Sequence, residues 1–368
     1  MGLADRDTGT AGRGRTDAPD RDRVIDVRDA DERAASSHAA DARRDTGGRD
    51  QPDGRDAGSP TDIPGSGWKS IGKRVVTELK NDHVSLLAAG VAFKGLLALF
   101  PAIIAAISIW GLVADPAQIQ QQMANLTGAL PADAAGLIEG QMTQVAETGS
   151  GALSFALVVS ILIALWSASG GMAGLIEGCN AAYDEVDQRK FPIKRGLALA
   201  LTLGGIVFLL IALGLIAVLP GVVDQLGLGQ AGELAIRVAQ WPLLAVLVIG
   251  ALGVIYKVGP DRDSPQFKWA STGAIVATVL WLIGSALFTL YVENFGNFGE
   301  TYGAFAGIIV LMLWLFLTAF VVLLGAEINA EQERQTLRDT TVGAEEPIGR
   351  RGAHAADTTP EEFEGRTS

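Results

Sequence analysis

Charged side chains interrupt an otherwise apolar part of this chain at a few positions where they could bind or move ions. Lys94 lies about ten residues after the start of the first long apolar stretch, which is about 15 Å along a helix. A lysine at the centre of a membrane helix costs about 2.5–3.5 kcal/mol on insertion scales. Two interpretations stay open. The side chain faces a polar cavity between helices, or it snorkels to the nearer membrane surface.

Glu177 and Glu327 stand at the ends of two other apolar stretches. A helix C-terminus disfavours negative charge, so we expect each glutamate to have a cationic or hydrogen-bond-donating partner. The candidate partners are Lys94, Arg195, Lys257 and Arg262. One interpretation is a structural ion pair, and the other is a site that couples protons or ions. With nearby amide and phenol side chains, the candidate intramembrane polar cluster comprises Lys94, Glu177, Asn180, Tyr183, Arg262, Glu327 and Asn329.

Glycines recur every fourth position at two places in the apolar stretches. One set is Gly170, Gly174 and Gly178, and the other is Gly299, Gly303 and Gly307. A glycine face lets a neighbouring helix backbone approach closely, so these residues predict helix packing within a bundle. Self-association, or a sliding contact in a transporter, is the alternative.

The arrangements that enzymes need are missing from the sequence. Serines occur in the segment 166–170 (WSASG), but no histidine lies in or beside a later apolar stretch to activate one. Cys179 is the single cysteine, and the three histidines are too scattered to form a metal cluster. There is also no phosphate-binding loop. We therefore expect no enzyme, no cofactor and no metal, and the net charge of −12 argues against a nucleic-acid partner.

Six stretches are long enough to carry these residues across a bilayer, which needs about 20 apolar residues of helix. Segments such as 204–219 lack a polar stripe at helical spacing, so lipid is a better solvent for them than water. The fold class we predict is an all-α membrane protein, a bundle of six transmembrane helices. The stretches are approximately 84–113, 152–176, 196–219, 239–257, 269–292 and 303–327.

The loops between these stretches alternate in positive charge. Lysines and arginines precede the first stretch and follow the second and fourth, whereas the loops 114–151 and 293–302 have none. Because cytoplasmic loops carry the excess of basic residues, both termini are predicted to lie in the cytoplasm of a bacterial inner membrane. Asp115-Pro116 and Pro131 are helix start signals in the long outer loop, which predicts short periplasmic helices between spans 1 and 2.

The two ends of the chain are poor in large apolar side chains. Residues 1–66 consist mainly of Arg, Asp, Gly, Ala, Ser and Thr, and residues 333–368 have a similar composition. Such segments bury too little apolar area to offset the entropy of ordering. We therefore predict disordered tails over 1–66 and 333–368 around a membrane domain at 67–332.

Several segments together resemble the YihY/BrkB family of bacterial inner-membrane proteins. The matching stretches are 87–93 (LAAGVAF), 166–171 (WSASGG), 180–185 (NAAYDE), 259–262 (GPDR) and 291–329, which includes NFGNFGETYG and GAEIN. The resemblance implies six spans, a role in serum resistance and envelope integrity, and lipid A precursor handling in a related member. It also brings an older label, a tRNA-processing ribonuclease. The chain departs from the family at Lys94, where an aromatic residue such as Tyr is expected.

Two hypotheses of different classes follow. The first is a protein of envelope integrity that transports or flips a lipid or another amphiphile, with membrane lipids as partners. The second is a scaffold that does not transport and that binds an envelope protein or a second copy of itself. A ribonuclease is the remote alternative.

Overall fold

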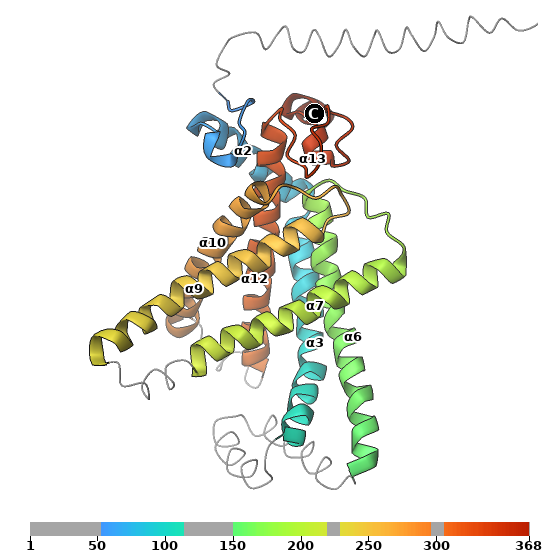
Figure 1. The fold of residues 1–368 in the computed structure, drawn as a ribbon, viewed down its shortest axis with the longest axis vertical. Coiled ribbons are helices and arrows are strands. Elements are labelled where there is room, and N and C mark those ends of the chain that lie inside the picture. The colour runs from blue at the N-terminus through green and yellow to red at the C-terminus, as the bar shows by residue number, and fades with distance from the viewer. Residues whose placement is uncertain (1–52, 114–149, 219–228, 296–304, 368) are drawn as a thin grey trace, which may run out of the picture. The chain divides into compact units, whose positions relative to one another are not determined.

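The computed structural model describes residues 53–113, 150–218, 229–295 and 305–367. The elements in these ranges are helices, and the one extended pairing among them is an isolated bridge between Pro265 and Thr341. In chain order the helices are η1 (Pro60–Asp62), α2 (Gly65–Asn81), α3 (Val84–Val113), α6 (Ser150–Ala182), α7 (Phe191–Leu213), the π-helical turn η2 (Gly214–Val218), α9 (Gly229–Val258), α10 (Phe267–Phe295), α12 (Ala306–Gln335), α13 (His354–Asp357) and α14 (Pro360–Thr367) (Figure 1).

Within the described ranges, five helical segments are long and apolar enough to cross a membrane. They are Ile161–Ala182, Phe191–Ile216, Leu234–Val258, Phe267–Asn294 and Ala306–Gln335. Helix α3 is 30 residues long. Its side chains are described only as far as Ala98, and the apolar part Val84–Ala98 is by itself shorter than a membrane span. The prediction of an all-α protein with several membrane spans therefore agrees with the structure, while the number six stays a prediction.

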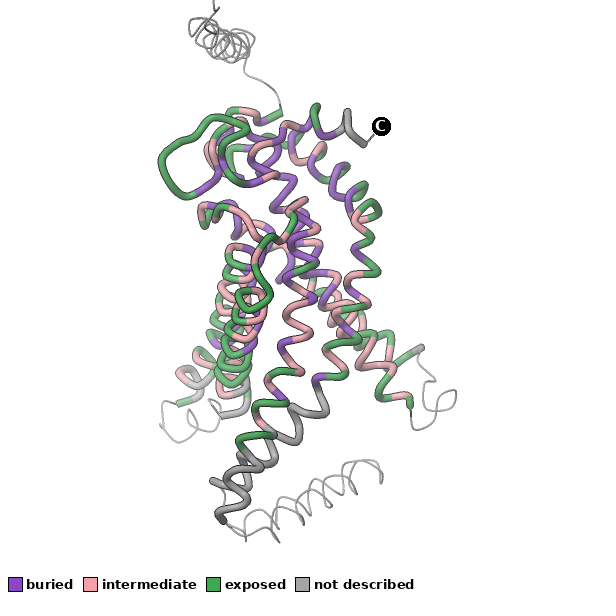
Figure 2. The backbone as a smooth tube through the Cα atoms, turned by 90° about the vertical axis from the view of Figure 1, so that its right-hand side faces the viewer, coloured by how far each residue is buried: buried purple, intermediate pink, exposed green. Residues whose placement is uncertain are grey.

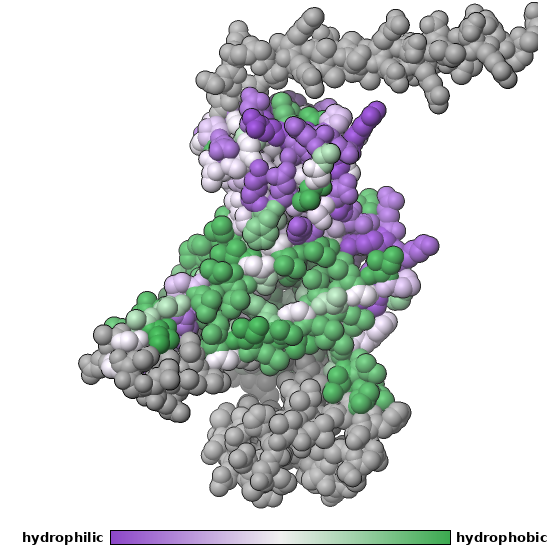
Figure 3. Space-filling model, in the orientation of Figure 1, coloured by the Kyte–Doolittle hydropathy of each residue, from purple (hydrophilic) through white to green (hydrophobic). Residues whose placement is uncertain are grey.

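The middle of the helices has an apolar outer surface. Large apolar side chains of α7 and α10 are exposed there, including Leu210 and Ile283. Figure 3 shows hydrophobic residues gathered over this middle region and hydrophilic residues at the end that carries α2 and the C-terminal segment. Because exposing this much apolar area to water is unfavourable, the surface is suited to lipid.

Three helices, α3, α6 and α12, pack on one another, and the remaining spans are added to their outside. Helix α10 packs on α12, α9 packs on α10, and α7 packs on α6. At the crossing of α3 and α6, a Cβ on Gly171 would lie 3.6 Å from the backbone nitrogen of Gly95. This spacing shows that the two helix backbones approach closely there.

Among the described glycines, a pair that the fourfold spacing did not single out makes the closest approach between two helices. A Cβ on Gly325 of α12 would lie 2.8 Å from the Gly273 carbonyl oxygen and 2.9 Å from the Ala277 Cβ of α10. Among the predicted packing residues, Gly178 does contact a neighbour, because its Cβ would lie 2.6 Å from Leu323.

The other predicted packing glycines behave differently. Gly174 lies against the Lys94 side chain, whereas Gly170 and Gly307 have open space where a side chain would stand. For Gly170 and Gly307 the expectation of close packing is therefore wrong, since a repeat every fourth position fixes a helix face but not what that face meets. Gly299 and Gly303 lie outside the described residues.

Burial is concentrated at the end of the helices that carries α2, the connection 259–266 and the segment 336–363. We call this the polar end. Leu323 and Ala326 of α12 are fully buried there, together with Tyr183, Tyr256 and Trp269. In Figure 2, the buried parts of the trace likewise gather toward this end.

The predicted boundaries of the two tails differ from the structure. Residues Pro52–Ser368 form one compact unit. On the N-terminal side Ala57 and Ile63 are buried, and on the C-terminal side Arg351, Ala355 and Phe363 are buried. Residues 1–52, the rest of the predicted N-terminal tail, lie outside the described residues. So do residues 114–149, where the short periplasmic helices are predicted.

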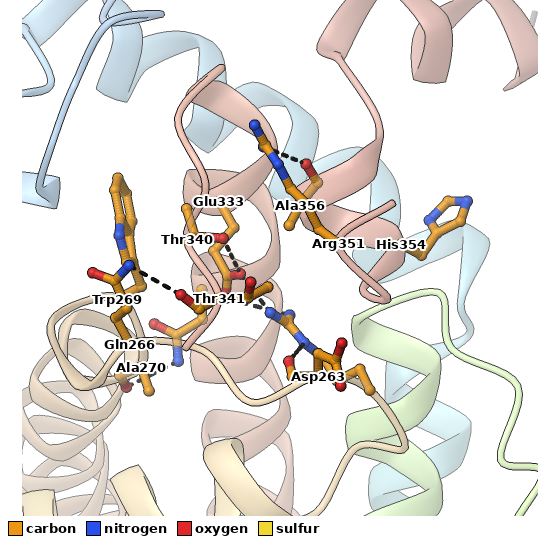
Figure 4. A network of polar contacts seen from close by, with 12 residues as sticks. Asp263, Gln266, Trp269, Ala270, Glu333, Thr340, Thr341, Arg351, His354 and Ala356 are labelled. Carbon is orange, nitrogen blue, oxygen red and sulfur yellow. Dashed lines mark hydrogen bonds and ion pairs between the residues drawn. The ribbon is translucent and has the colours of Figure 1, made fainter. Parts of the chain in front are cut away.

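The C-terminal segment is held by polar contacts that composition does not reveal. The Arg351 guanidinium donates to the carbonyls of Leu337, at 2.7 Å, Arg338, at 3.1 Å, and Ala356, at 2.8 Å. Figure 4 shows the Arg351 side chain reaching Ala356. These bonds satisfy backbone oxygens that would otherwise be buried without partners, so the segment needs little apolar area to pack.

Candidate functional site

The polar end brings together residues from distant parts of the chain. Asn180, near the end of α6, donates from Nδ2 to the Ile176 carbonyl at 3.0 Å and accepts from the Asp261 backbone N–H at 2.7 Å. Its side chain is 4% exposed. The amide therefore holds the connection between α9 and α10 against α6.

Arg262 and Glu333 form an ion pair that is fully buried. The Arg262 Nη2 atom lies 2.6 Å from Glu333 Oε2, and neither side chain is exposed. The guanidinium also lies over the Tyr183 ring, at 4.7 Å from its centroid. Thr340 donates from Oγ1 to Glu333 at 2.9 Å, as Figure 4 shows. The pair is thus hydrogen-bonded on several sides, which a buried ion pair needs if it is not to destabilise the fold.

A second group of charges lies along the end of α12. Arg334 bonds to Asp184 at 2.5 Å and also to Glu331. Arg74 of α2 lies 2.5 Å from Glu331 and 2.7 Å from Gln335. Two arginines therefore neutralise two carboxylates.

Asn329 fixes α12 to α10 through backbone contacts. Its Nδ2 donates to the Ala270 carbonyl at 3.1 Å, and its Oδ1 accepts from the Gly273 N–H at 2.7 Å. The residue is fully buried. This geometry makes Asn329 a residue that positions helices.

Glu327 faces another acid. The residue is 1% exposed, and its carboxyl lies within hydrogen-bonding reach of the Asp82 carboxyl. No salt bridge reaches Glu327 from the residues that the structure describes, and its Oε1 has no hydrogen-bond partner among them. Of the two expected kinds of partner, the described residues give Glu327 a hydrogen-bonding one, Asp82, and no cation, because the nearby arginines already bond to Glu331, Glu333 and Asp184.

Burial changes the acidity of the carboxyl groups just outside the spans. Burial, together with the neighbouring Asp184 and Glu331 charges, raises the pKa of Asp82 to about 6, although the hydrogen bond to Glu327 and the Arg334 charge act to lower it. Burial, together with the Asp82 and Glu331 charges, raises the pKa of Glu78 to about 7. Both shifts favour the protonated form, as expected where burial and like charge act together.

Lys94 and Glu177 are not part of this cluster. Both side chains are exposed. The Lys94 Nζ lies 3.3 Å from the position that a Cβ on Gly174 would take, so the lysine lies along the surface of α6. In the described part of the chain, no salt bridge joins either residue to a partner. Arg195, one of the expected partners, stacks on the Trp166 ring at 3.8 Å.

An apolar groove lies among the membrane helices, away from the polar cluster. It has a volume of about 330 Å³ and is bordered by α3, α6, α7 and α12. Small residues widen it, because Gly95, Gly171 and Gly205 contribute no side chain. Val91, Leu175, Leu209 and Leu315 line its walls, and Thr202 and Thr318 are the polar residues that line it.

Comparison with known protein families shows which family the chain belongs to. A family model for the virulence factor BrkB matches residues 75–348. The chain belongs to the virulence factor BrkB family. The resemblance seen in the sequence motifs is thereby confirmed.

Relatives agree that this is a membrane family. YfkH of Bacillus subtilis, which is named a ribonuclease-like protein, is 33% identical over 251 residues, covering 66% of this chain and 88% of YfkH. A UPF0761 membrane protein of Chlorobium luteolum is 28% identical over 269 residues, covering 72% of this chain and 60% of that protein. Another from Tolumonas auensis is 38% identical over 97 residues, covering 25% and 32%. The chain thus spans less than two thirds of either UPF0761 relative. No solved structure matches.

The BrkB-family segment contains most of the charged residues at the polar end, including residues that the motifs did not single out. Asp82, Glu331 and Arg334 lie within 75–348, whereas Arg74 lies one residue before it. For Glu331, the sequence does carry a signal that it lies near Glu327. Glu327 and Glu331 are four residues apart and so share a face of α12, which continues helical to Gln335.

Metal binding finds no support in the same residues. Among the described side chains, no group of three or more His, Cys, Asp or Glu residues could hold a metal ion. The arrangement at the polar end can bind and exchange protons, and it can join helices. The groove can hold an apolar chain.

Proposed function

We propose that this BrkB-family protein transports or flips a lipid or another amphiphile across a bacterial inner membrane, with both termini in the cytoplasm. The observation that carries the proposal is the apolar groove of about 330 Å³ on the membrane helices. Its volume and lining suit an acyl chain, which is the part of a lipid that needs an apolar path.

The position of the groove supports the proposal further. It borders α7, whose outer residues Leu203, Val207 and Leu210 are exposed and apolar. A chain that entered from lipid would therefore pass between apolar surfaces. The polar end, with its buried charges, supplies a region of different polarity where a headgroup could be received.

Reconstitution tests the proposal directly. The full chain is inserted into liposomes that contain a fluorescent phospholipid, and the accessibility of the probe to a quencher outside is followed over time. We expect a faster exchange of the probe between leaflets than in liposomes without protein. An unchanged rate, with correctly inserted and folded protein, contradicts the proposal and favours the scaffold.

The alternatives make different predictions. A scaffold, with an envelope protein or a second copy as its partner, loses its cellular role when residues 1–51 are deleted, although the compact unit Pro52–Ser368 is intact. The ribonuclease alternative is prompted by the printed name of YfkH. It requires RNA cleavage that stays with the protein through stringent purification.

A further inference from the structure

We propose that the carboxyl groups of Asp82 and Glu327 form a proton-binding site, in which one shared proton holds the corner between α2 and α3 against α12. This inference does not depend on lipid transport. It concerns a pair of acids that the described structure leaves without a cation.

The geometry of the pair requires a proton. The two carboxyl groups lie within hydrogen-bonding reach of each other. An ionised carboxylate only accepts hydrogen bonds, so two ionised groups repel, whereas one protonated group donates to the other. Two acids that meet in a buried place therefore share a proton.

The charged groups around the pair do not replace that proton. Asp184 after α6 and Glu331 of α12 raise the cost of a negative charge on both carboxyl groups, whereas Arg334 partly offsets this cost at Asp82. Glu78 of α2 is a further acid that Asp82 repels. Arg334 bonds to Asp184 and Glu331, and Arg74 bonds to Glu331. With the two arginines bonded to other acids, Glu78, Asp82 and Glu327 have no salt bridge to any of the residues that the structure describes.

The remaining neighbours are neutral or only weakly acidic. Asn81 donates to Glu78 Oε1 at 3.1 Å and not to the pair. Cys179 of α6, which lies near Glu327, is fully buried. Neither residue brings a positive charge to the pair.

The environment of the Glu327 carboxyl group favours the binding of a proton. The residue is 1% exposed, and its Oε1 has no hydrogen-bond partner among the described residues. A charged carboxylate in this position would carry an uncompensated oxygen in a low-dielectric site. Protonation removes that penalty. A metal ion is a poorer fit, since the described residues contain no group of three ligands that could hold one.

The position of the pair gives the proton a structural effect. Asp82 follows α2 directly, and His83 turns the chain into α3 with φ of 51°, a left-handed conformation that is uncommon for a residue other than glycine. Loss of the proton makes Asp82 and Glu327 repel across this corner. The site therefore connects proton binding to the packing of α2 and α3 on α12.

Infrared spectroscopy of the full chain in lipid nanodiscs tests the site. A protonated carboxyl group has a carbonyl band that an ionised one lacks. Against wild type below the Asp82 pKa of about 6, we expect Glu327→Gln to lose one such component and Asp82→Asn to lose the same component. Glu177→Gln, an acid on the exposed surface of α6, should lose none. Asp82→Asn keeps the test decisive if Glu327→Gln does not fold.

A second readout separates proton binding from packing. Wild-type thermal stability should fall as the pH rises through the Asp82 pKa of about 6, and either amide variant should reduce this dependence, because an amide donates a hydrogen bond at every pH. A wild-type protein with no protonated component that depends on Glu327, or an unchanged pH dependence in both variants, overturns the proposal.

Discussion

The side-chain oxygen of Asn180 in α6 accepts a hydrogen bond from the backbone N–H of Asp261, which lies 81 residues later in the chain, at 2.7 Å. This bond joins two of the sequence motifs, 180–185 and 259–262, that are far apart along the chain. Beside it, the Arg262 guanidinium lies over the Tyr183 ring. The motifs therefore meet in one place because they hold the connections between helices together.

Removing the Asn180 amide should destabilise the fold. Asn180→Ala leaves the Asp261 N–H without its acceptor, and an unmet buried donor costs about 1–3 kcal/mol. We expect a lower melting temperature in detergent or nanodiscs. Asn294→Ala is the matched control, because Asn294 is exposed and, among the described residues, bonds within its own helix to the Leu290 carbonyl. Equal melting temperatures for the two variants would show that the Asn180 bonds are unimportant.

The buried pair of Arg262 and Glu333 should behave non-additively. Arg262→Met leaves the Glu333 carboxylate buried without its cation, which typically costs about 3–5 kcal/mol. Adding Glu333→Leu removes the orphaned charge, so the double variant should be more stable than Arg262→Met alone. A double-mutant cycle from thermal or denaturant unfolding measures this. Simple additivity of the two losses would contradict an interaction between these side chains.

The contact between α10 and α12 should not tolerate a side chain at Gly325. Gly325→Ala places a methyl group against the Tyr256 hydroxyl and 2.8 Å from the Gly273 carbonyl oxygen, closer than real Cβ contacts come. Overpacking of this kind costs about 1–3 kcal/mol or more. Folded yield and melting temperature should both fall. Gly307→Ala, in the same helix but with open space around it, should have little effect, and a comparable loss there would indicate a general intolerance of α12 to substitution.

The acidity of Glu78 predicts how stability depends on pH. Its folded pKa of about 7 exceeds its usual 4.5, so the folded state holds the proton over a pH range where the unfolded state has lost it. Stability is fully present below the usual pKa and falls as pH rises from about 4.5 to 7. In Glu78→Gln, part of this fall should disappear. The melting temperature measured across this range tests the prediction, and an identical slope in both proteins would refute it.

Membrane orientation can be tested with single cysteines. Cys179 is the one native cysteine and is buried. In a Cys179→Ala background, we expect a cysteine introduced into the loop 114–149 to react with an impermeant maleimide added to intact cells. A cysteine in the loop 186–190 should react only after the cells are opened. The reverse pattern would invert the predicted topology.

The apolar helices were accessible from sequence because their physical cause is local. A run of about 20 apolar residues must satisfy its backbone internally in lipid, so α7 and α10 could be located without knowing their neighbours. The polar cluster depends on pairing between distant residues. Glu327 shows this, because its partner Asp82 lies before the first span in a segment that reads as a solvated flank.

The C-terminal segment shows a second limit of composition. Its packing depends on Arg351 and on small residues such as Ala355, which carry little hydrophobic signal. Lys94 shows a third. Its place in an apolar stretch indicated a special environment, and the structure instead lays it along the glycine surface of α6 at Gly174. The rotation of α3 about its axis decides which way Lys94 faces, and sequence periodicity alone does not set that rotation.

The most direct measurement is lipid translocation by variants that fill the groove. Gly205 lines the groove, and its neighbour Gly204 does not. Both have open space where a Cβ would stand, so a side chain can begin at either position without meeting a neighbour. In liposomes, we predict that Gly205→Leu slows the exchange of a fluorescent lipid between leaflets, while Gly204→Leu exchanges it at the wild-type rate. Equal rates for the wild type and both variants would contradict a transport path through this groove.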